Sequence, residues 1–186
     1  SRKAIWAGTA AGIFRRSADR TAFELVSADV VQDFSEDAIG RMWVTDARRA
    51  FRSLDERLSR GDQRSGIRSA VGSCLFRDRN GNLWIGTSGQ GLWSAPMGPQ
   101  RTPERVAVRV GLPDQVVSSV FEDRAGNIWV GTRGGLVRFF EHDVTMVMRD
   151  HGLLSNTVRA IDTARDGSVW VGTPDGLIRV SHLDGV

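Results

Sequence analysis

The sequence predicts an all-β chain of short antiparallel strands, and three observations support this. A tryptophan recurs with spacings of 37, 41, 45 and 41 residues, at Trp6, Trp43, Trp84, Trp129 and Trp170. Short segments rich in β-branched residues, such as Val116–Phe121 and Val158–Ile161, precede the tryptophans as strands would. Nowhere does an apolar stripe of helical period run for three turns. Four short strands in about 41 residues are typical of a β-propeller blade.

The best repeated unit predicts its four strands in order. Val116–Phe121 is the first strand, and the phrase "IWVGT" that begins at Ile128 is the second. The glycine and leucine that follow this phrase start a third strand, and Val144–Met148 alternates as a fourth. Polar turns of the form Asp-x-x-Gly-Asn join the first strand to the second at Asp78 and Asp123.

The second unit has diverged most from the others. Asp46 stands where the other units have threonine, and Ala50 stands where they have glycine. The segment Asp46–Arg60 is the nearest rival for a helix, but its phase matches the repeat. We therefore interpret it as strand and loop.

The repeated residues are interpreted as scaffold. A tryptophan that recurs once per blade is expected to fill the gap between neighbouring sheets. The glycines of the Gly-Thr and Gly-Leu pairs are expected to be turn residues. The turn aspartates are expected to be caps rather than calcium ligands; they are Asp37, Asp78 and Asp123. Cys74 is expected to be a small buried residue, whereas Trp93, outside the ladder, is expected to make a surface contact.

Nothing in the sequence predicts catalysis, a bound metal or a cofactor. The histidines fall in no metal-binding spacing; they are His142, His151 and His182. A Gly-x-Ser-x-Gly motif is absent, and no pair of acidic residues suits glycoside hydrolysis. The net charge is +3, with Lys3 as the only lysine, and we expect no nucleic acid partner.

The repeated phrase resembles a known family. "S-x-V-F-E-D-x-x-G-N-I-W-V-G-T-x-x-G-L-x-R", which begins at Ser118, is similar to the two-component regulator propeller repeat. The resemblance is strong over residues 66–94, 111–140 and 152–180 and weaker over 1–26 and 28–60. It implies the periplasmic ligand-binding region of a membrane-bound sensor, joined to a kinase or cyclase module. It leaves the ligand open, because the consensus positions are structural.

Function is expected where the copies differ. By analogy with propellers, loops entering the first strands and hairpins joining the second and third strands share one face. Candidate residues on that face could hydrogen-bond a polar small molecule or an oligosaccharide; they are Gln90, Asp114, Gln115, Arg133, Asn156 and Asp175.

Two alternatives to a sensor stay open. One is a protein-interaction scaffold. The other is an enzyme similar to streptogramin lyase, another propeller with a similar blade phrase. That activity would require a catalytic histidine near bound magnesium, and His151 is the one candidate.

The chain is expected to hold part of a ring. Residues 1–186 form one propeller region that starts at the second strand of one blade and ends after the third strand of another. This amounts to about four and a half blades, whereas a ring of about seven would need about 290 residues. The two end faces should then be exposed, which favours self-association.

Overall fold

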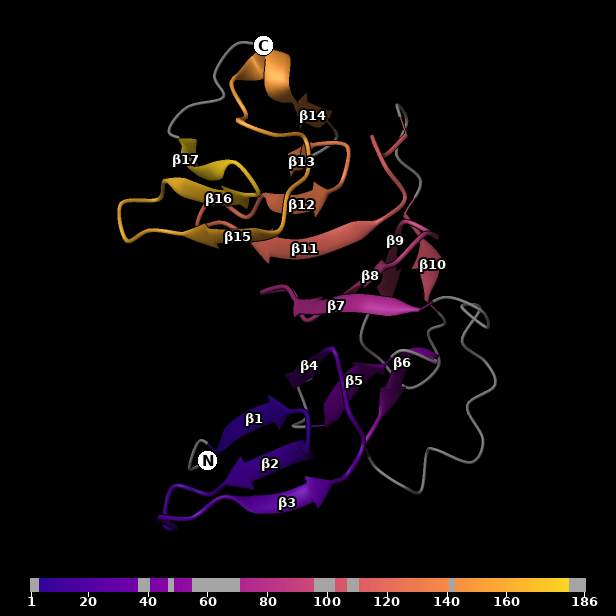
Figure 1. Ribbon diagram of the computed structural model, residues 1–186, viewed down its shortest axis with the longest axis vertical. Helices are drawn as coiled ribbons and strands as arrows, with labels where there is room; N and C mark the ends of the chain where they lie inside the picture. The colour runs from indigo at the N-terminus through magenta and orange to yellow at the C-terminus, as the bar shows by residue number, and fades with distance from the viewer. Residues whose placement is uncertain are drawn as a thin grey trace.

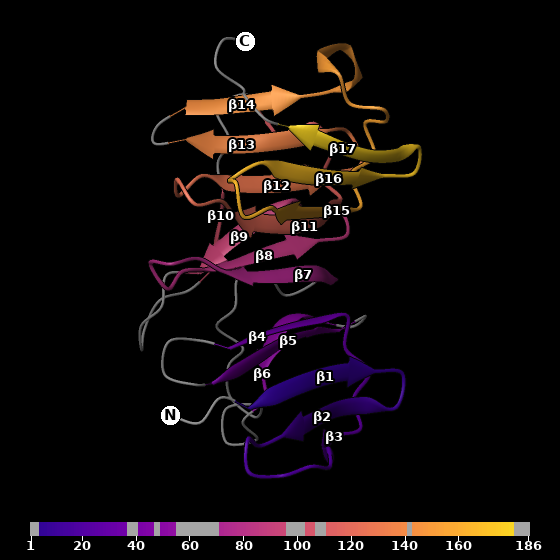
Figure 2. The same cartoon turned by 90° about the vertical axis from the view of Figure 1, so that its left-hand side faces the viewer.

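The computed structural model describes residues 4–36, 41–46, 49–54, 71–95, 103–106, 111–140 and 143–180. Within them, the strands form five sheets, and every pairing between neighbouring strands is antiparallel. Sheets 1 to 4 follow one another along the long axis of the molecule in chain order, and sheet 5 lies beside sheet 4 (Figures 1 and 2). This is the β-propeller architecture that the repeat predicts.

Each sheet is numbered here by its place in the chain. Sheet 1 holds β1 (Ile5–Thr9), β2 (Gly12–Arg16) and β3 (Glu24–Ser27). Sheet 2 holds β4 (Asp33–Glu36), β5 (Met42–Asp46) and β6 (Arg49–Ser53). Sheet 3 holds β7 (Gly72–Arg77), β8 (Leu83–Thr87), β9 (Leu92–Ala95) and β10 (Glu104–Arg105).

The last two sheets complete the series. Sheet 4 holds β11 (Val117–Glu122), β12 (Ile128–Thr132), β13 (Leu136–Phe140) and β14 (Asp143–Val147). Sheet 5 holds β15 (Ala160–Thr163), β16 (Val169–Thr173) and β17 (Gly176–Val180). Between them lies a single turn of 3-10 helix, η1 (Arg149–His151).

The predicted strand order is confirmed at both ends. Within the described residues, the tryptophan strand is the first strand of sheet 1 and the middle strand of sheet 5, which agrees with the predicted strand order. Arg49–Ser53 is a strand and not a helix, as predicted. The fourth strand expected in sheet 2 falls on residues 55–70, which lie outside the described residues.

The first strands of sheets 2 to 5 form a continuous inner row. In this row β4 contacts β7, β7 contacts β11, and β11 contacts β15. The pairing register shifts at Ser73 in β7 and at Ser118 in β11, which gives each strand an extra residue. Ser73 Oγ donates to the carbonyl of Val117 at 2.5 Å, and Ser118 Oγ donates to that of Val158 at 2.6 Å. The bulged serines therefore tie each inner strand to the next.

Each sheet has a forward face, toward the next sheet in the chain, and a back face, toward the preceding one. Trp43 on the forward face of sheet 2 packs against Leu75 and Ile85 of sheet 3. Trp129 on sheet 4 is 3% exposed and packs against Val169 and others of sheet 5. The tryptophans fill the gaps between sheets, as predicted.

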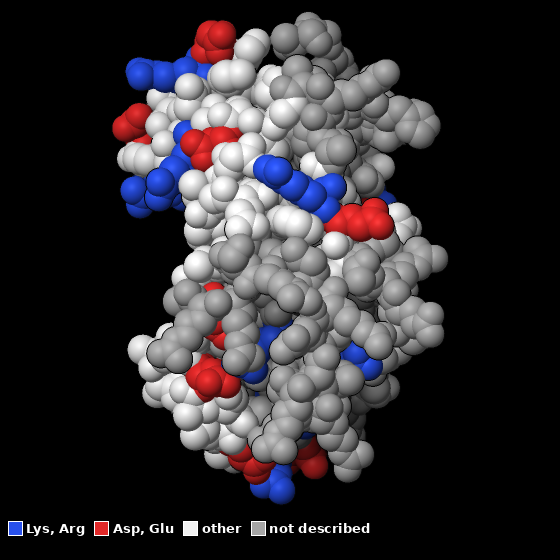
Figure 3. Space-filling view, turned by 90° about the vertical axis from the view of Figure 1, so that its right-hand side faces the viewer, with Lys and Arg blue, Asp and Glu red and all other residues white. Residues whose placement is uncertain are grey.

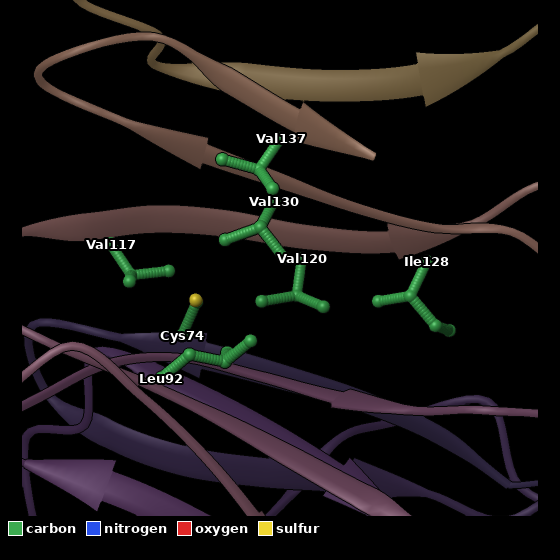
Figure 4. Packing of buried hydrophobic residues seen from close by; sticks show 7 residues of the cluster. All are labelled: Cys74, Leu92, Val117, Val120, Ile128, Val130 and Val137. Atoms are coloured by element: carbon green, nitrogen blue, oxygen red, sulfur yellow. The ribbon is translucent and has the colours of Figure 1, made fainter. Parts of the chain in front are cut away.

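Figure 4 shows this packing between sheets 3 and 4. Val117, Val120, Val130 and Ile128 of sheet 4 approach Cys74 and Leu92 of sheet 3, and all are buried. Cys74 is thus a small buried residue, as predicted. Burial, together with the charge of Asp33, raises the pKa of its thiol to about 12, so it stays protonated.

Two expectations are corrected. Trp93 is not a surface contact, because it packs with Trp43 against the cluster between sheets 2 and 3. The glycine of the Gly-Thr pair is not a turn residue: Gly86 and Gly131 lie within β8 and β12. A Cβ on Gly131 would lie 2.4 Å from Val158 Cγ1, and one on Gly86 would lie 2.4 Å from Cys74 Sγ. Glycine is required there so that the inner strands can approach closely.

The glycines before the third strands are turn residues, as predicted. Gly91 and Gly135 have φ of +75° and +150° at the hairpins that precede β9 and β13. Residues with a side chain rarely adopt this conformation. No helix among the described residues is both long enough and apolar enough to span a membrane.

Candidate functional site

Two classes of loop meet on one face of the stack. Gly91, in the hairpin between β8 and β9, donates its amide to the carbonyl of Gln115, in the loop entering β11, at 2.9 Å. Thr157, in the loop entering β15, donates its hydroxyl to the carbonyl of Arg133, in the hairpin after β12, at 3.3 Å. We call these entering loops and hairpins together the rim.

The repeated threonine shapes the rim hairpins. Thr132 Oγ1 donates to the carbonyl of Gly135 at 2.8 Å and accepts the amide of Gly134 at 3.1 Å. Thr87 does the same for Gly91 and Gln90. In sheet 2, where Asp46 replaces this threonine, the carboxylate instead pairs with Arg52 at 3.2 Å. The threonine of the repeated phrase therefore holds the hairpin, which leaves recognition to the residues between the repeated ones.

Two predicted site residues support the loops that carry them. Asp114 Oδ1 accepts the amide of Val116 at 2.6 Å, which closes the loop just before β11. Asn156 Oδ1 accepts the amide of Arg149 at 2.7 Å, which joins the loop before β15 to η1. In both cases, a side-chain oxygen already serves the backbone.

Gln115 has a partner that the sequence does not reveal. Its Oε1 accepts from Arg105 Nη2 at 2.5 Å, and both side chains are exposed. Arg105 comes from β10, the outermost strand of sheet 3, whereas Gln115 belongs to the loop entering sheet 4. A guanidinium has five N–H donors and a glutamine amide has two, so most of the donors in this pair stay available.

The other predicted residues lie farther along the rim. Gln90 is half-buried and adjoins Gly91, which places it at the same junction as Gln115. Arg133 is exposed, and its backbone is held by Val116 and Thr157 on either side. Asp175 is exposed in the hairpin between β16 and β17. The rim thus brings Gln90, Gln115 and Arg105 together, and spreads the others over the next two junctions.

The turn aspartates lie at the opposite ends of the strands. Asp123 accepts the indole N–H of Trp129 at 2.7 Å, the side-chain amide of Asn127 at 2.7 Å and its backbone amide at 2.9 Å. Asp78 makes the same three contacts with Asn82 and Trp84. Burial acts to raise the pKa of Asp123, but these donors outweigh it and the pKa is lowered. Asp78 and Asp123 are thus caps, as predicted, and Asp37 lies outside the described residues.

His151 helps to close a turn of the backbone. It is exposed in η1, and its Nδ1 accepts the amide of Met148 at 3.3 Å. His142 and His182 lie outside the described residues. Within the described ranges, no group of three or more histidine, cysteine, aspartate or glutamate side chains could hold a metal ion.

Charges on the outside of the molecule are mixed. On the face in Figure 3, the acidic and basic side chains among the coloured residues lie in small groups of both signs. An ion pair joins the turns of sheets 3 and 4: Arg79 Nε contacts Glu122 at 2.5 Å, and Arg79 Nη1 donates to the carbonyl of Arg124 at 3.1 Å. Arg79 thus clamps two neighbouring sheets.

Three segments of the chain match one family model. Residues 66–89, 111–134 and 152–175 match the model described as the two component regulator propeller. The second and third of these segments run from the rim loop through the first strand and the tryptophan strand to the next hairpin. No curated protein matches the chain in sequence.

Solved structures share the fold. A protein described as the extracellular domain of a hybrid two component system, BT3049 of B. thetaiotaomicron, aligns with a TM-score of 0.76 and 20% identity, over 98% of this chain and 26% of that one. A streptogramin B lyase aligns with a TM-score of 0.66 and 13% identity, over 95% of this chain and 60% of that one. YCF48 bound to a D1 peptide aligns with a TM-score of 0.67 and 11% identity, over 100% of this chain and 63% of that one.

At sequence identities of 20%, 13% and 11%, these alignments show a shared fold and give no information about the site. The chain spans about a quarter of the BT3049 domain and less than two thirds of the other two chains. The chain shares the β-propeller fold with an extracellular domain of a two component system, a lyase and a protein solved with a bound peptide.

Proposed function

The chain carries two component regulator propeller repeats, and we propose that it is part of the ligand-binding sensor domain of a membrane-bound signalling receptor. The description of BT3049 as the extracellular part of a hybrid two component system supports a location outside the cytoplasm. We propose the periplasm, with a kinase or cyclase module as the attached output. Binding at the rim would be read out by that module, without turnover of the ligand.

One observation carries the proposal. The residues repeated in each unit make hydrogen bonds that hold the fold, whereas polar residues that differ from unit to unit lie on the rim. Thr87 and Thr132 hold hairpins, and Asp78 and Asp123 hold turns at the other ends of the strands. On the rim, Asp114 and Asn156 hold their loops, whereas Gln115 pairs with the exposed Arg105 and Arg133 has an exposed side chain. This difference between structural residues and rim residues supports ligand recognition as the function.

The available groups suit a polar ligand. Arg105, Gln115 and Gln90 offer amide and guanidinium donors at the junction of sheets 3 and 4. Arg133 adds a positive charge at the next junction, and Asp175 adds acceptors beyond it. A ligand with several hydroxyl or acidic groups, such as a small oligosaccharide, would match this series of groups along the rim. Asp114 and Asn156 would act by holding the loops in place.

The alternatives differ in what they need from the rim. A scaffold would bind a peptide there, as YCF48 is described to do with a D1 peptide. A lyase would need His151 at a magnesium site, yet among the described residues no group of three or more histidine, cysteine, aspartate or glutamate side chains could hold a metal ion. We propose a non-enzymatic domain on that ground.

Binding measurements with the chain test the proposal. Thermal shift and calorimetry would use neutral and acidic oligosaccharides, mono- and dicarboxylic acids, and a peptide library. We expect one of the small polar classes to bind, and Arg133→Ala and Gln115→Ala to weaken it at least tenfold. Arg124→Ala is the matched control, an exposed arginine at the opposite ends of the strands.

The proposal fails if the rim variants bind the ligand as well as the parent does, or if peptides bind and small molecules do not. Loss of a streptogramin B, detected by mass spectrometry with magnesium present and abolished by His151→Ala, would favour the lyase instead.

A further inference from the structure

The loops that enter β11 and β15 carry an amide at the same position. The segment "GLPDQ" that begins at Gly111 aligns with "GLLSN" at Gly152, so Gln115 and Asn156 are equivalent. Each amide lies at a junction between two described sheets: Gln115 between sheets 3 and 4, and Asn156 between sheets 4 and 5. Any regularity in how these amides are held is then a property of the repeat.

The partners of these amides fix which atom faces the protein. Gln115 Oε1 accepts from Arg105 Nη2 at 2.5 Å, and Asn156 Oδ1 accepts the backbone amide of Arg149 at 2.7 Å. A guanidinium and a backbone N–H are donors only, so in both cases the amide oxygen must face this partner. Asn156 is half-buried and supports its loop, whereas Gln115 is exposed. Gln115 Nε2 is therefore turned away from Arg105 as an available donor.

The pair of Arg105 and Gln115 rests on the backbone of the neighbouring hairpin. A Cβ on Gly91 would lie 2.7 Å from Gln115 Oε1 and 3.6 Å from Arg105 Nη2. The Gly91 amide also donates to the carbonyl of Gln115 at 2.9 Å, which holds the loop against the hairpin. Because glycine has no side chain, both polar groups can lie close to this backbone. The guanidinium and the amide are thus held side by side at one place on the rim.

The next junction carries two more arginines. The hydroxyl of Thr157 donates to the carbonyl of Arg133 at 3.3 Å, and the preceding residue, Asn156, holds the backbone of Arg149. Both arginines are exposed, and consecutive residues of one loop bind their backbones. A guanidinium stays charged at every ordinary pH and matches the oxygens of an acidic group. The junction of sheets 4 and 5 is therefore a second place for an anion.

The protein does not neutralise these arginines. Among the described residues, Arg105, Arg133 and Arg149 form no ion pair with a carboxylate. Arg52 of sheet 2 and Arg79 of sheet 3, by contrast, each form one. The positive charges at the two junctions therefore remain for a ligand.

The carboxylates near the rim have other neighbours. Asp114 Oδ1 accepts a backbone amide of its own loop at 2.6 Å, and Asp150 Oδ1 lies 3.2 Å from His151 Nδ1. Glu104 precedes Arg105 in β10, and consecutive residues of a strand point to opposite faces. The two junctions thus present mainly donors.

We propose that the rim binds an acidic oligosaccharide, with one carboxylate or sulfate at each of the two junctions. This inference rests on the function proposed above and narrows its ligand from polar molecules in general to anionic ones. Since packed sheets lie about 10 Å apart, acidic groups with about that separation can reach Arg105 and Arg133 together. The uncharged donors of Gln115 suit the hydroxyl and ring oxygens of a sugar between them.

Calorimetry with matched trimers tests the proposal. A galacturonate trimer carries carboxylates, a sulfated galactose trimer carries sulfates, and the methyl ester of the galacturonate trimer keeps the sugar skeleton without the charge. We expect one of the acidic trimers to bind at least tenfold more tightly than the ester, with an affinity that falls as salt is raised. An ester that binds equally well, and binds more weakly to Gln115→Ala, overturns this inference but leaves the proposed function standing. Failure of both acidic trimers to bind also overturns it.

Replacing the amide by an acid tests which atom faces the ligand. Gln115→Glu keeps the size and the acceptor oxygen but puts a negative charge in place of the NH2 group, so it should weaken binding of the acidic trimer at least tenfold. Asn80→Asp, in an exposed turn at the opposite ends of the strands, makes the same change of amide to acid and is the matched control that should bind like the parent. Thermal midpoints check that both variants fold. Binding that is unchanged or tighter in Gln115→Glu, or equally weakened in Asn80→Asp, would overturn the proposal.

Discussion

Sheets 4 and 5 carry nearly the same phrase, "IWVGT" and "VWVGT", in different surroundings. Trp129 is 3% exposed against sheet 5, whereas Trp170 is only half-buried. A Cβ on Gly131 would lie 2.4 Å from Val158, whereas one on Gly172 would have its nearest neighbour at 3.7 Å. A repeated residue therefore stabilises the fold through the sheet that packs on it. Its contribution to stability depends on how closely that sheet approaches.

The largest effect should come from the tryptophans. Trp129→Ala should lower the free energy of unfolding by about 3–5 kcal/mol, because it leaves a cavity between two packed sheets. Trp170→Ala leaves no enclosed cavity and should cost less than half as much. Urea midpoints of both variants, measured side by side, check the difference. Equal losses of unfolding free energy in the two variants would show that the two tryptophans contribute alike, contrary to this account.

The cap beneath each tryptophan should rank next. Asp123→Ala leaves the indole of Trp129 and the amides of Asn127 without their acceptor, at a cost of about 2–3 kcal/mol. In sheet 5, Ala164 already stands at this position, and the turn keeps its backbone bond from Ala164 N to Ser168 O at 2.9 Å. Arg165→Ala, at an exposed residue of that turn, is the control and should cost less than about 0.5 kcal/mol.

The same carboxylate predicts a dependence on pH. The pKa of Asp123 is lowered from its ordinary value of 3.8, so its ionised form stabilises the fold above that pH. This contribution should disappear as the pH falls from about 4 through the lowered pKa. Asp123→Asn should show a shallower loss of stability over the same range, measured by urea unfolding at several pH values. Parallel acid profiles for parent and variant would contradict this role.

Substitution of the glycine at the close contact between sheets 4 and 5 should have an intermediate effect on stability. Gly131→Ala forces a methyl against Val158 and Ser119 and should cost about 1–3 kcal/mol. Gly172→Ala meets only ordinary contacts, so its cost should stay below about 0.5 kcal/mol. Thermal midpoints of the pair measure the difference, and a Gly131→Ala variant as stable as Gly172→Ala would show that the sheets separate easily.

The clamp between turns should have the smallest effect. Arg79 binds Glu122 and two carbonyls of the next turn, but its side chain is about half exposed, so Arg79→Ala should cost roughly 0.5–1 kcal/mol. Arg124 is the equivalent residue of sheet 4, and sheet 5 offers Thr163 where Glu122 would stand. Arg124→Ala should therefore leave the free energy of unfolding unchanged. Raised salt should reduce the cost of Arg79→Ala and leave Arg124→Ala unaffected.

The sequence predicts the strands because their signals are local. Alternation, the turn of Asp78 and the tryptophan spacing all lie within one unit, and they place the blades in order. The indole bond to Asp123, the bulged Ser118 and the glycine at 131 depend on contacts within or between folded sheets. The partners of Ser118 and Gly131 lie up to about 40 residues away, so their identity becomes visible only in the folded chain.

The candidate site was predictable only in part. Loop position alone selects Gln90, Gln115 and Arg133, and the structure places them on the rim. Their role in binding remains a prediction. Position alone could not separate Asn156, which serves the backbone, from residues with available donors. Nor could it identify Arg105, because an outer strand of two residues gives no periodic signal.

Amide hydrogen exchange tests the central comparison most directly. Residues 128–132 and 169–173 are both middle strands with almost the same sequence, so their intrinsic exchange rates are similar. In this chain, the account predicts exchange at least tenfold faster in β16 than in β12. Equal protection of the two strands would contradict it, because the following sheet would then contribute nothing to the stability of the phrase.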